Sequence, residues 1–251
     1  MPSCLEASWK QPLLGSAPTS RLLWVLDRPR PWPARVLAAD FLASPPSAGT
    51  LLLRQPDASP VSSEPRSFSP ELPSERLLVC THGSRDRCCG QWGVRLARTL
   101  REAGAPVWEV SHLGGHRFAP TLWCLRDWKV YGRVGLDEAG HFSEQAALSW
   151  LEQWRIQPGG CLSGLRGSAR YAPNLQVLEA YLREARGQWP EQLSELSGDQ
   201  VDVHWPDGRS EVLQVNWNRR SYRSSQSCTD IPLGVEADYQ AWSVSAVALT
   251  T

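Results

Sequence analysis

The chain contains 251 residues, 41% hydrophobic and 21% charged, a composition typical of a folded globular protein. Lys plus Arg and Asp plus Glu number 26 each, so no net charge attracts nucleic acid or an anionic membrane. No apolar run approaches the ~20 residues of a membrane-spanning helix. The N-terminal MPSCLEASWKQPLLG lacks the basic start and apolar stretch of a secretory signal. We therefore expect one or two domains that bind neither nucleic acid nor membrane.

The N-terminal part predicts two short strands and one helix. Apolar runs of strand length occupy residues 21–26 and 50–55, and residues 34–42 have helical spacing. Residues 57–75 are rich in Pro and Ser, which is typical of a surface loop or linker. We therefore assign residues 1–56 to an N-terminal strand and helix half, which either extends the sheet of the following domain or forms a smaller unit.

Residues 76–198 predict a single domain of alternating strands and helices. Residues 91–103 place Trp92, Leu96 and Leu100 at i, i+4 and i+8, the spacing of an amphipathic helix. Further strands are predicted at 76–80, 106–112, 117–125 and 128–134, and further helices at 142–154, 172–186 and 189–196. This order indicates an α/β or α+β fold, in which helices cover a mixed sheet.

The C-terminal residues 199–251 predict a β-rich segment. Two alternating runs within residues 201–217 flank Pro206-Asp207-Gly208, the pattern of a β-hairpin.

Cysteine usage indicates a reducing compartment. The chain has seven cysteines, and without an export signal we expect a cytoplasmic location, where clustered cysteines indicate metal binding or catalysis. Adjacent Cys88 and Cys89 are poorly placed for a disulfide with each other. The remaining scattered cysteines are interpreted mostly as small buried hydrophobic residues: Cys4, Cys124, Cys161 and Cys228.

Two short motifs hold most of the metal-binding side chains, namely CTHGSRDRCCG (80–90) and SHLGGHRFAP (111–120). Cys80 ends a predicted strand, whereas Cys88 and Cys89 begin a predicted helix, where the N–H groups and dipole favour thiolates. His112 ends the neighbouring strand, and two glycines permit a tight turn before His116. A loop that folds back could therefore bring these thiols and imidazoles together.

Two thiolates and two imidazoles suit either a tetrahedral zinc site or a 2Fe–2S cluster. Spacing alone does not distinguish zinc from a 2Fe–2S cluster. A separation of seven or eight residues between the cysteines is, however, wide for a zinc knuckle and suits a larger cluster. Leu113 stands where an HExxH metalloprotease needs its Glu. No carboxylate pair indicates a glycosidase, and no Cys-x-x-Cys pair supports a thiol oxidoreductase.

The two motifs together resemble the sucrase/ferredoxin-like family, thioredoxin-like 2Fe–2S proteins that include fungal actin-patch-associated relatives. The resemblance extends more weakly to Cys4 with LLWVLDRPRPW and to residues 172–186. It implies a thioredoxin-like fold and one 2Fe–2S cluster. The implied ligands, which are also the metal-binding residues under a zinc interpretation, are Cys80, His112, His116 and one of Cys88 or Cys89. The family pattern Arg-Asp-x-x-Cys-Gly places Cys89 in register.

Four neighbours of these ligands are candidates for hydrogen bonds or charge around the site: His82, Arg85, Asp86 and Arg117. For His82 we expect a loop histidine with satisfied hydrogen bonds. For Arg85 and Asp86 we expect an ion pair that holds the loop, beside the site. For Arg117, a balance of cluster charge and a plain salt bridge are equally consistent with the sequence.

The expected function is electron transfer or redox sensing by a non-enzymatic carrier. No flavin or nicotinamide fingerprint is present, so a separate redox protein or reductase is expected as its partner. The alternative is a structural zinc protein that uses the same four ligands in a scaffold or binding role.

Overall fold

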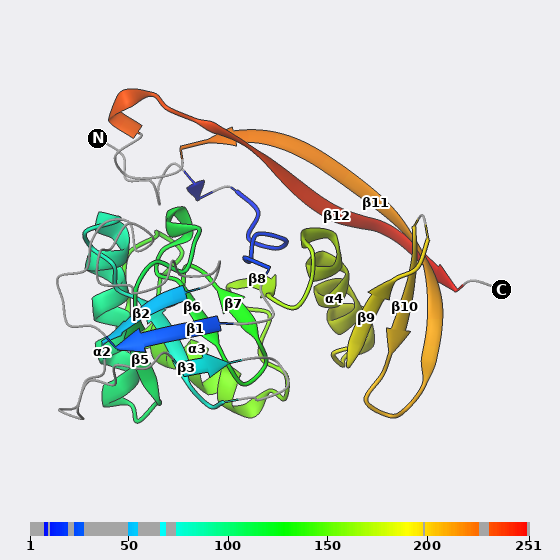
Figure 1. Cartoon of the computed structure of the whole chain (residues 1–251), viewed down its shortest axis with the longest axis horizontal. Coiled ribbons are helices and arrows are strands. Elements are labelled where there is room, and N and C mark those ends of the chain that lie inside the picture. The colour runs from blue at the N-terminus through cyan, green and yellow to red at the C-terminus, as the bar shows by residue number, and fades with distance from the viewer. Residues whose placement is uncertain are drawn as a thin grey trace.

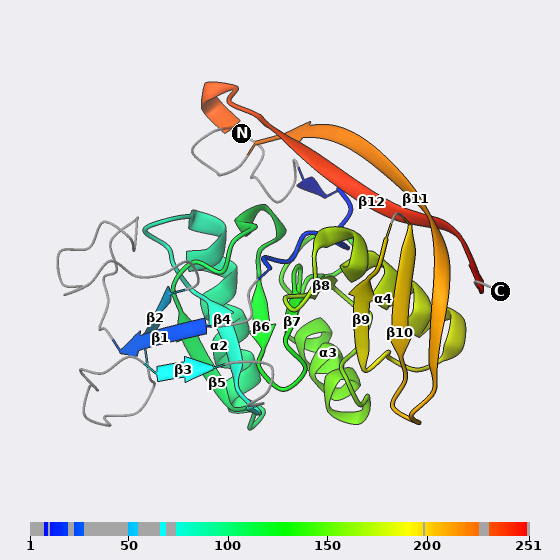
Figure 2. The same cartoon turned by 45° about the vertical axis from the view of Figure 1, so that its right-hand side comes forward.

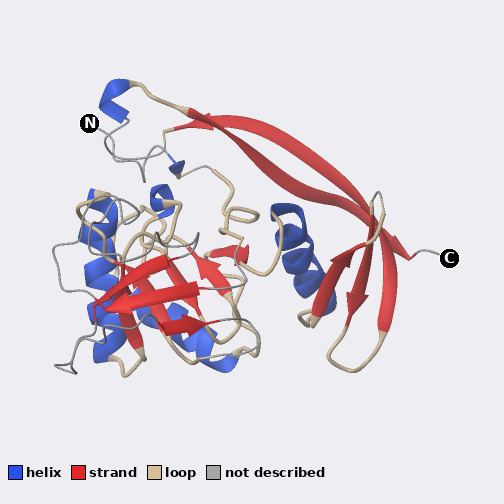
Figure 3. Cartoon of the chain, in the orientation of Figure 1, coloured by secondary structure: helices blue, strands red, loops and turns tan. Residues whose placement is uncertain are grey.

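The computed structural model describes residues 8–9, 11–19, 23–27, 50–54, 66–68, 74–197, 199–225 and 231–249. Two sheets form this part of the chain, as Figure 3 shows. The large sheet contains β1 (Leu23–Asp27), β2 (Thr50–Arg54), β3 (Arg66–Phe68), β4 (Leu77–Cys80), β5 (Val107–Val110), β6 (Leu122–Cys124), β7 (Lys129–Tyr131) and β8 (Leu165–Ser168). The second sheet contains β9 (Gln192–Glu195), β10 (Gln200–His204), β11 (Ser210–Ser224) and β12 (Ala237–Leu249).

The centre of the large sheet confirms the predicted mixed sheet with flanking helices. The strand order is β3-β1-β2-β5-β4-β6-β7-β8. β4 and β5 are parallel and are joined through helix α2 (Val94–Glu102), whereas β6 is antiparallel to β4 and β7 is antiparallel to β6. A parallel pair with a helical crossover, followed by an antiparallel hairpin on the other side of its first strand, is the thioredoxin-like arrangement. The peptide bond Ala119–Pro120, just before β6, is cis.

Strand β4 is buried on both faces. Leu77 and Val79 pack in the same cluster as α2 and α3 (Glu144–Ile156), while Leu78 and Cys80 belong to the cluster on the opposite face. Successive side chains of a strand point to opposite faces, and full burial of an aliphatic side chain contributes roughly 1.5–3 kcal/mol. Strand β4 is therefore firmly held, and its last residue points away from the helices.

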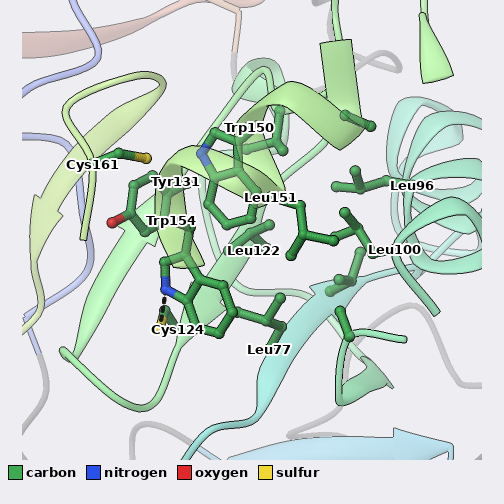
Figure 4. Packing of buried hydrophobic residues seen from close by; sticks show 14 of the residues in the cluster. Leu77, Leu96, Leu100, Leu122, Cys124, Tyr131, Trp150, Leu151, Trp154 and Cys161 are labelled. Atoms are coloured by element: carbon green, nitrogen blue, oxygen red, sulfur yellow. Dashed lines mark hydrogen bonds between the residues drawn. The ribbon is translucent and has the colours of Figure 1, made fainter. Parts of the chain in front are cut away.

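The helix-side cluster is built around aromatic side chains. Figure 4 shows Trp150 and Trp154 of α3 beside Tyr131, with the indole Nε1 of Trp154 donating a hydrogen bond to Cys124 Sγ at 3.1 Å. Cys124 and Cys161 are 0% and 1% exposed, which confirms their interpretation as buried residues. Cys4 and Cys228 lie outside the described residues.

The N-terminal strands extend the same sheet. β1 pairs in parallel with β2, and β2 pairs antiparallel with β5, so the strands predicted at 21–26 and 50–55 are confirmed. β3 pairs antiparallel with β1 and lies inside the segment predicted as the loop 57–75. The helix predicted at 34–42 lies outside the described residues.

The helices predicted at 91–103, 142–154 and 172–186 are confirmed as α2, α3 and α4 (Pro173–Arg186). A π-helical turn, η2 (Cys89–Gly93), precedes α2, so the helical segment starts earlier than predicted. Helix α4 has Pro in its first turn, and Gly187, with φ +74°, follows its last residue; these are the favoured residues at the two positions. Among the helices that the structure describes, none is both long and apolar enough to cross a membrane.

One predicted element is wrong, and another is shorter than predicted. The helix predicted at 189–196 is strand β9, because Pro190 disfavours helical backbone before it and Leu193 is buried against β10. The strand predicted at 117–125 shrinks to β6, because a 3₁₀ turn, η3 (His116–Phe118), replaces its first part. Strand β8 was not predicted.

The second sheet lies beyond α4, as Figures 1 and 2 show. One side of α4 packs in a cluster with the second sheet, and that cluster includes Leu178, Leu182 and Trp205. β10 and β11 form the predicted hairpin. The paired strands β11 and β12, hereafter the ribbon, arch from this sheet over the large-sheet body, and at their far end Gln11 donates a hydrogen bond to Ser224.

Candidate metal centre

Glycines bring the first motif back onto the end of β4. A Cβ on Gly90 would lie 2.6 Å from Gly83 Cα, so the two backbones touch where the loop closes. A Cβ on Gly93 would lie 1.9 Å from the carbonyl oxygen of Cys80. Only glycine permits these approaches. The start of the helix therefore lies directly against the strand end, and Cys89 lies near Cys80.

The second motif forms a tight turn beside β5. Gly114 and Gly115 both have left-handed backbone, with φ +80° and +66°, and they reverse the chain between His112 and His116. The backbone N–H of His112 donates a hydrogen bond to Nδ1 of buried His82 at 3.3 Å. The turn predicted from the paired glycines is present, and the first motif holds it through His82.

These two motifs meet in one buried group. One ligand atom from each of Cys80, Cys89 and His112 lies within 4.8 Å of the others, and this group could hold a metal ion. His116 adjoins it, because its Nδ1 lies 3.3 Å from Nε2 of His112. Both cysteines are 0% exposed, His116 is 6% exposed and His112 is partly buried.

Without a bound cation, the thiols of Cys80 and Cys89 do not readily ionise together. The Cys89 thiol donates a hydrogen bond to Cys80, which holds the pKa of Cys80 well below its usual range against the opposing effect of burial. The same hydrogen bond, burial and the Cys80 thiolate raise the pKa of Cys89 well above its usual range. A bound cation would remove this repulsion and let both sulfurs act as ligands.

The chemistry of the donors fits a metal centre. The Nδ1 atom of His112 is buried and has no hydrogen-bond partner among the described residues. Buried polar atoms are normally paired, and one ring nitrogen of His112 lies in the group with the two thiols, so this imidazole is suited to a metal.

The structure separates the remaining candidates. Cys88 is buried but lies outside the described metal-binding group, and its backbone N–H donates to Oδ1 of Asp86 at 2.9 Å. Oδ2 of Asp86 lies 3.8 Å from Nε2 of His116, so Asp86 contacts the site. Arg85 is exposed, whereas Arg117 is 7% exposed and donates to Gln11.

Sequence reasoning missed two residues that hold the histidine turn. Arg166 of β8 donates from its guanidinium to the carbonyl oxygen of Gly114 at 2.9 Å. Ser8 donates from its hydroxyl to the carbonyl oxygen of Arg117. Both lie far from the motifs in sequence, and no local pattern marks them.

Fold and site together define a mixed α/β protein with a buried Cys/His group able to hold a metal. The sucrase/ferredoxin-like family model matches residues 19–156, which is more than half of the chain. The chain therefore belongs to the sucrase/ferredoxin-like family. Neither a curated protein nor a solved structure matches it.

Proposed function

We propose that this protein is an electron carrier or redox sensor that holds one 2Fe–2S cluster through Cys80, Cys89, His112 and His116. The observation that supports the proposal is the buried meeting of two thiols and two imidazoles from two separate motifs. Such a cluster supplies a one-electron change at iron.

The way the ligands are supplied favours a cluster over zinc. Structural zinc sites commonly take two cysteines from one short Cys-x₂₋₄-Cys knuckle. Here Cys80 ends a strand and Cys89 begins a helical turn, with eight residues between them. The family to which the chain belongs also carries ferredoxin in its description.

The chain's own residues would set the properties of the site. Two neutral imidazoles in place of two thiolates make the ligand set less negative, which raises the reduction potential relative to four cysteines. Burial of Cys80, Cys89 and His116 keeps water away from the sulfurs. Asp86 lies close enough to His116 to orient its ring.

We further propose that electrons come from a separate redox protein or reductase in a reducing, cytoplasmic compartment. None of the five cysteines that the structure describes forms a disulfide, and structural disulfides are the rule in oxidising compartments. His112 is the most exposed of the four proposed ligands, so its edge is the approach for a partner.

The test is anaerobic purification of the full chain, followed by iron, sulfide and zinc analysis, absorption spectroscopy and electron paramagnetic resonance of the reduced protein. We expect two irons and two sulfides per chain, visible absorption and a signal on reduction. A colourless protein with one zinc and no iron would overturn the cluster in favour of a structural zinc protein.

A further inference from the structure

Three arginines surround the ring of Phe118, immediately after the histidine turn. Their Cζ atoms lie 4.4 Å (Arg117), 5.4 Å (Arg133) and 5.4 Å (Arg166) from the ring centroid. Arg117 and Arg166 are only 7% and 2% exposed, and Arg133 is partly buried. Three positively charged side chains are thus concentrated around Phe118, where little of their surface is exposed to water.

The partners of these arginines are neutral. Arg166 donates to Oγ and the carbonyl oxygen of Ser16 and to the carbonyl oxygen of Gly114. Arg117 donates to the amide oxygen of Gln11. Arg133 donates to the carbonyl oxygens of Ser8 and Gln11. Within the described part of the chain, none of the three forms an ion pair with a carboxylate.

A buried cation without an anionic partner is costly, and this chain pairs its buried lysine. Lys129 lies 3.8 Å from a carboxylate oxygen of Glu179, and both side chains are almost fully buried. Arg166 has no such partner among the residues that the structure describes, and burial together with the charge of Arg117 lowers its pKa to about 9. Within the described residues, the arginine cluster is therefore short of negative charge.

The thiolates of the metal centre do not make up this shortage. Cys80 and Cys89 lie near enough to raise the pKa of Arg166, but less than burial and Arg117 lower it. Two thiolates are also neutralised by a bound metal, since Zn²⁺ and the core of two ferric irons with two sulfides each carry a charge of +2. A bound anion would balance the three arginines.

A cavity of about 310 Å³ adjoins the arginines. Arg117 and Arg166 line it together with the Gly114–Gly115 turn, and Tyr222 and Tyr239 of the ribbon line it from the other side. The guanidinium of Arg117 also stacks 3.8 Å from the ring centroid of Tyr239. This volume suits a small ligand.

We propose that this cavity binds a small molecule through a carboxylate or phosphate group held by Arg117 and Arg166. The planar guanidinium matches both oxyanions with paired hydrogen bonds, and such charged bonds are the strong ones in proteins. The tyrosine rings of the ribbon provide an apolar wall for the rest of the ligand. The proposed anion site depends on the arginines and the ribbon. The proposal is the same whether the neighbouring centre binds zinc or a 2Fe–2S cluster.

The test is calorimetric titration of the full chain with inorganic phosphate and, separately, with acetate, in chloride buffers of matched ionic strength. We expect saturable binding of at least one anion, and the stronger of the two identifies the chemistry. Arg117→Gln should weaken that binding at least tenfold. Arg219→Gln, which removes the same charge from an exposed site on the ribbon, should leave it unchanged.

Absence of saturable binding by either anion, or equal weakening in both variants, would overturn the proposal. If Arg117→Gln loses the native circular dichroism spectrum, Arg117→Lys takes its place, because it keeps the charge and loses the paired hydrogen bonds. Unchanged affinity in Arg117→Lys would then count against the site. Iron content measured on the same samples reports separately on the metal centre.

Discussion

Adjacent Cys88 and Cys89 have different surroundings, and substitution of each should show which of them is a metal ligand. Cys80→Ala and Cys89→Ala each remove a sulfur from the buried group, so both should abolish metal incorporation. Cys88→Ala is the matched control, because Cys88 is also buried but lies outside the group. Metal analysis of the three purified variants checks this. Loss of metal in Cys88→Ala with retention in Cys89→Ala would move the ligand to Cys88.

The histidines should control the potential rather than the presence of a cluster. His112→Cys and His116→Cys each replace a neutral ligand by an anionic one, which stabilises the oxidised state. We expect each variant to keep its iron and to have a lower reduction potential than the parent protein, measured by voltammetry. His204→Cys, at the exposed end of β10, is the control and should not change the potential. Unchanged potentials in both site variants would remove the histidines from the centre.

At the scale of single residues, the sequence allowed prediction of what lies within the two motifs and little beyond them. The four proposed ligands fall in two short segments with distinctive spacing, and the structure brings these segments together. Arg166 could not be predicted, because it reaches the histidine turn only after β8 has joined the sheet. For Arg117 the sequence left charge balance and a salt bridge equally open; within the described residues Arg117 is buried and donates to the side-chain amide of Gln11, a contact that no local pattern indicates.

The contact between η2 and β4 gives a prediction for a whole element. Ala usually stabilises a helix relative to Gly by roughly 0.5–1 kcal/mol. Gly93→Ala should instead destabilise the fold by about 2 kcal/mol, since its Cβ would meet the Cys80 carbonyl oxygen at 1.9 Å. The same shift should separate Cys89 from Cys80 and reduce metal content.

Denaturant unfolding and metal analysis measure the effect of Gly93→Ala. The control is Gln91→Ala, an exposed position in the same helical turn, where we expect a change within about 0.5 kcal/mol. A Gly93→Ala protein as stable as its parent, with full metal content, would show that the helix does not need this close approach.

Elements with strong local signals were predictable, and those fixed by distant partners were not. Helix α4 has an apolar stripe, a proline at its start and a glycine at its end, all readable in the sequence. Strand β9 has only four residues, and its pairing with β10 decides its conformation. Strand β3 has three residues inside a Pro- and Ser-rich segment, so no periodicity could indicate it.

For the whole molecule, a buried ion pair joins the large sheet to α4. Burial lowers the pKa of Lys129 on β7 and raises that of Glu179 on α4, and the two groups support each other's charged forms. Glu179→Leu should leave the lysine charge buried without its partner and cost about 3 kcal/mol. Lys129→Met combined with Glu179→Leu should recover most of this stability.

Thermal and denaturant unfolding of both variants provide the measurement for the Lys129–Glu179 pair. The contrast is Glu152→Gln, which breaks an exposed pair with Arg155 and should change stability by less than about 1 kcal/mol. If the double variant is as unstable as Glu179→Leu, the loss reflects packing around position 179 rather than an unpaired charge.

The ribbon is synthesised after the proposed metal ligands, so the two sites become complete at different times. The four proposed ligands lie between residues 80 and 116, whereas Tyr222 and Tyr239, which wall the arginine cavity, come roughly a hundred residues later. At ~5–20 residues per second, ribosomes make these tyrosines seconds after the ligands. The nascent chain therefore carries a complete ligand set, with the side of the cavity beside Arg117 still open, before the last strands are made.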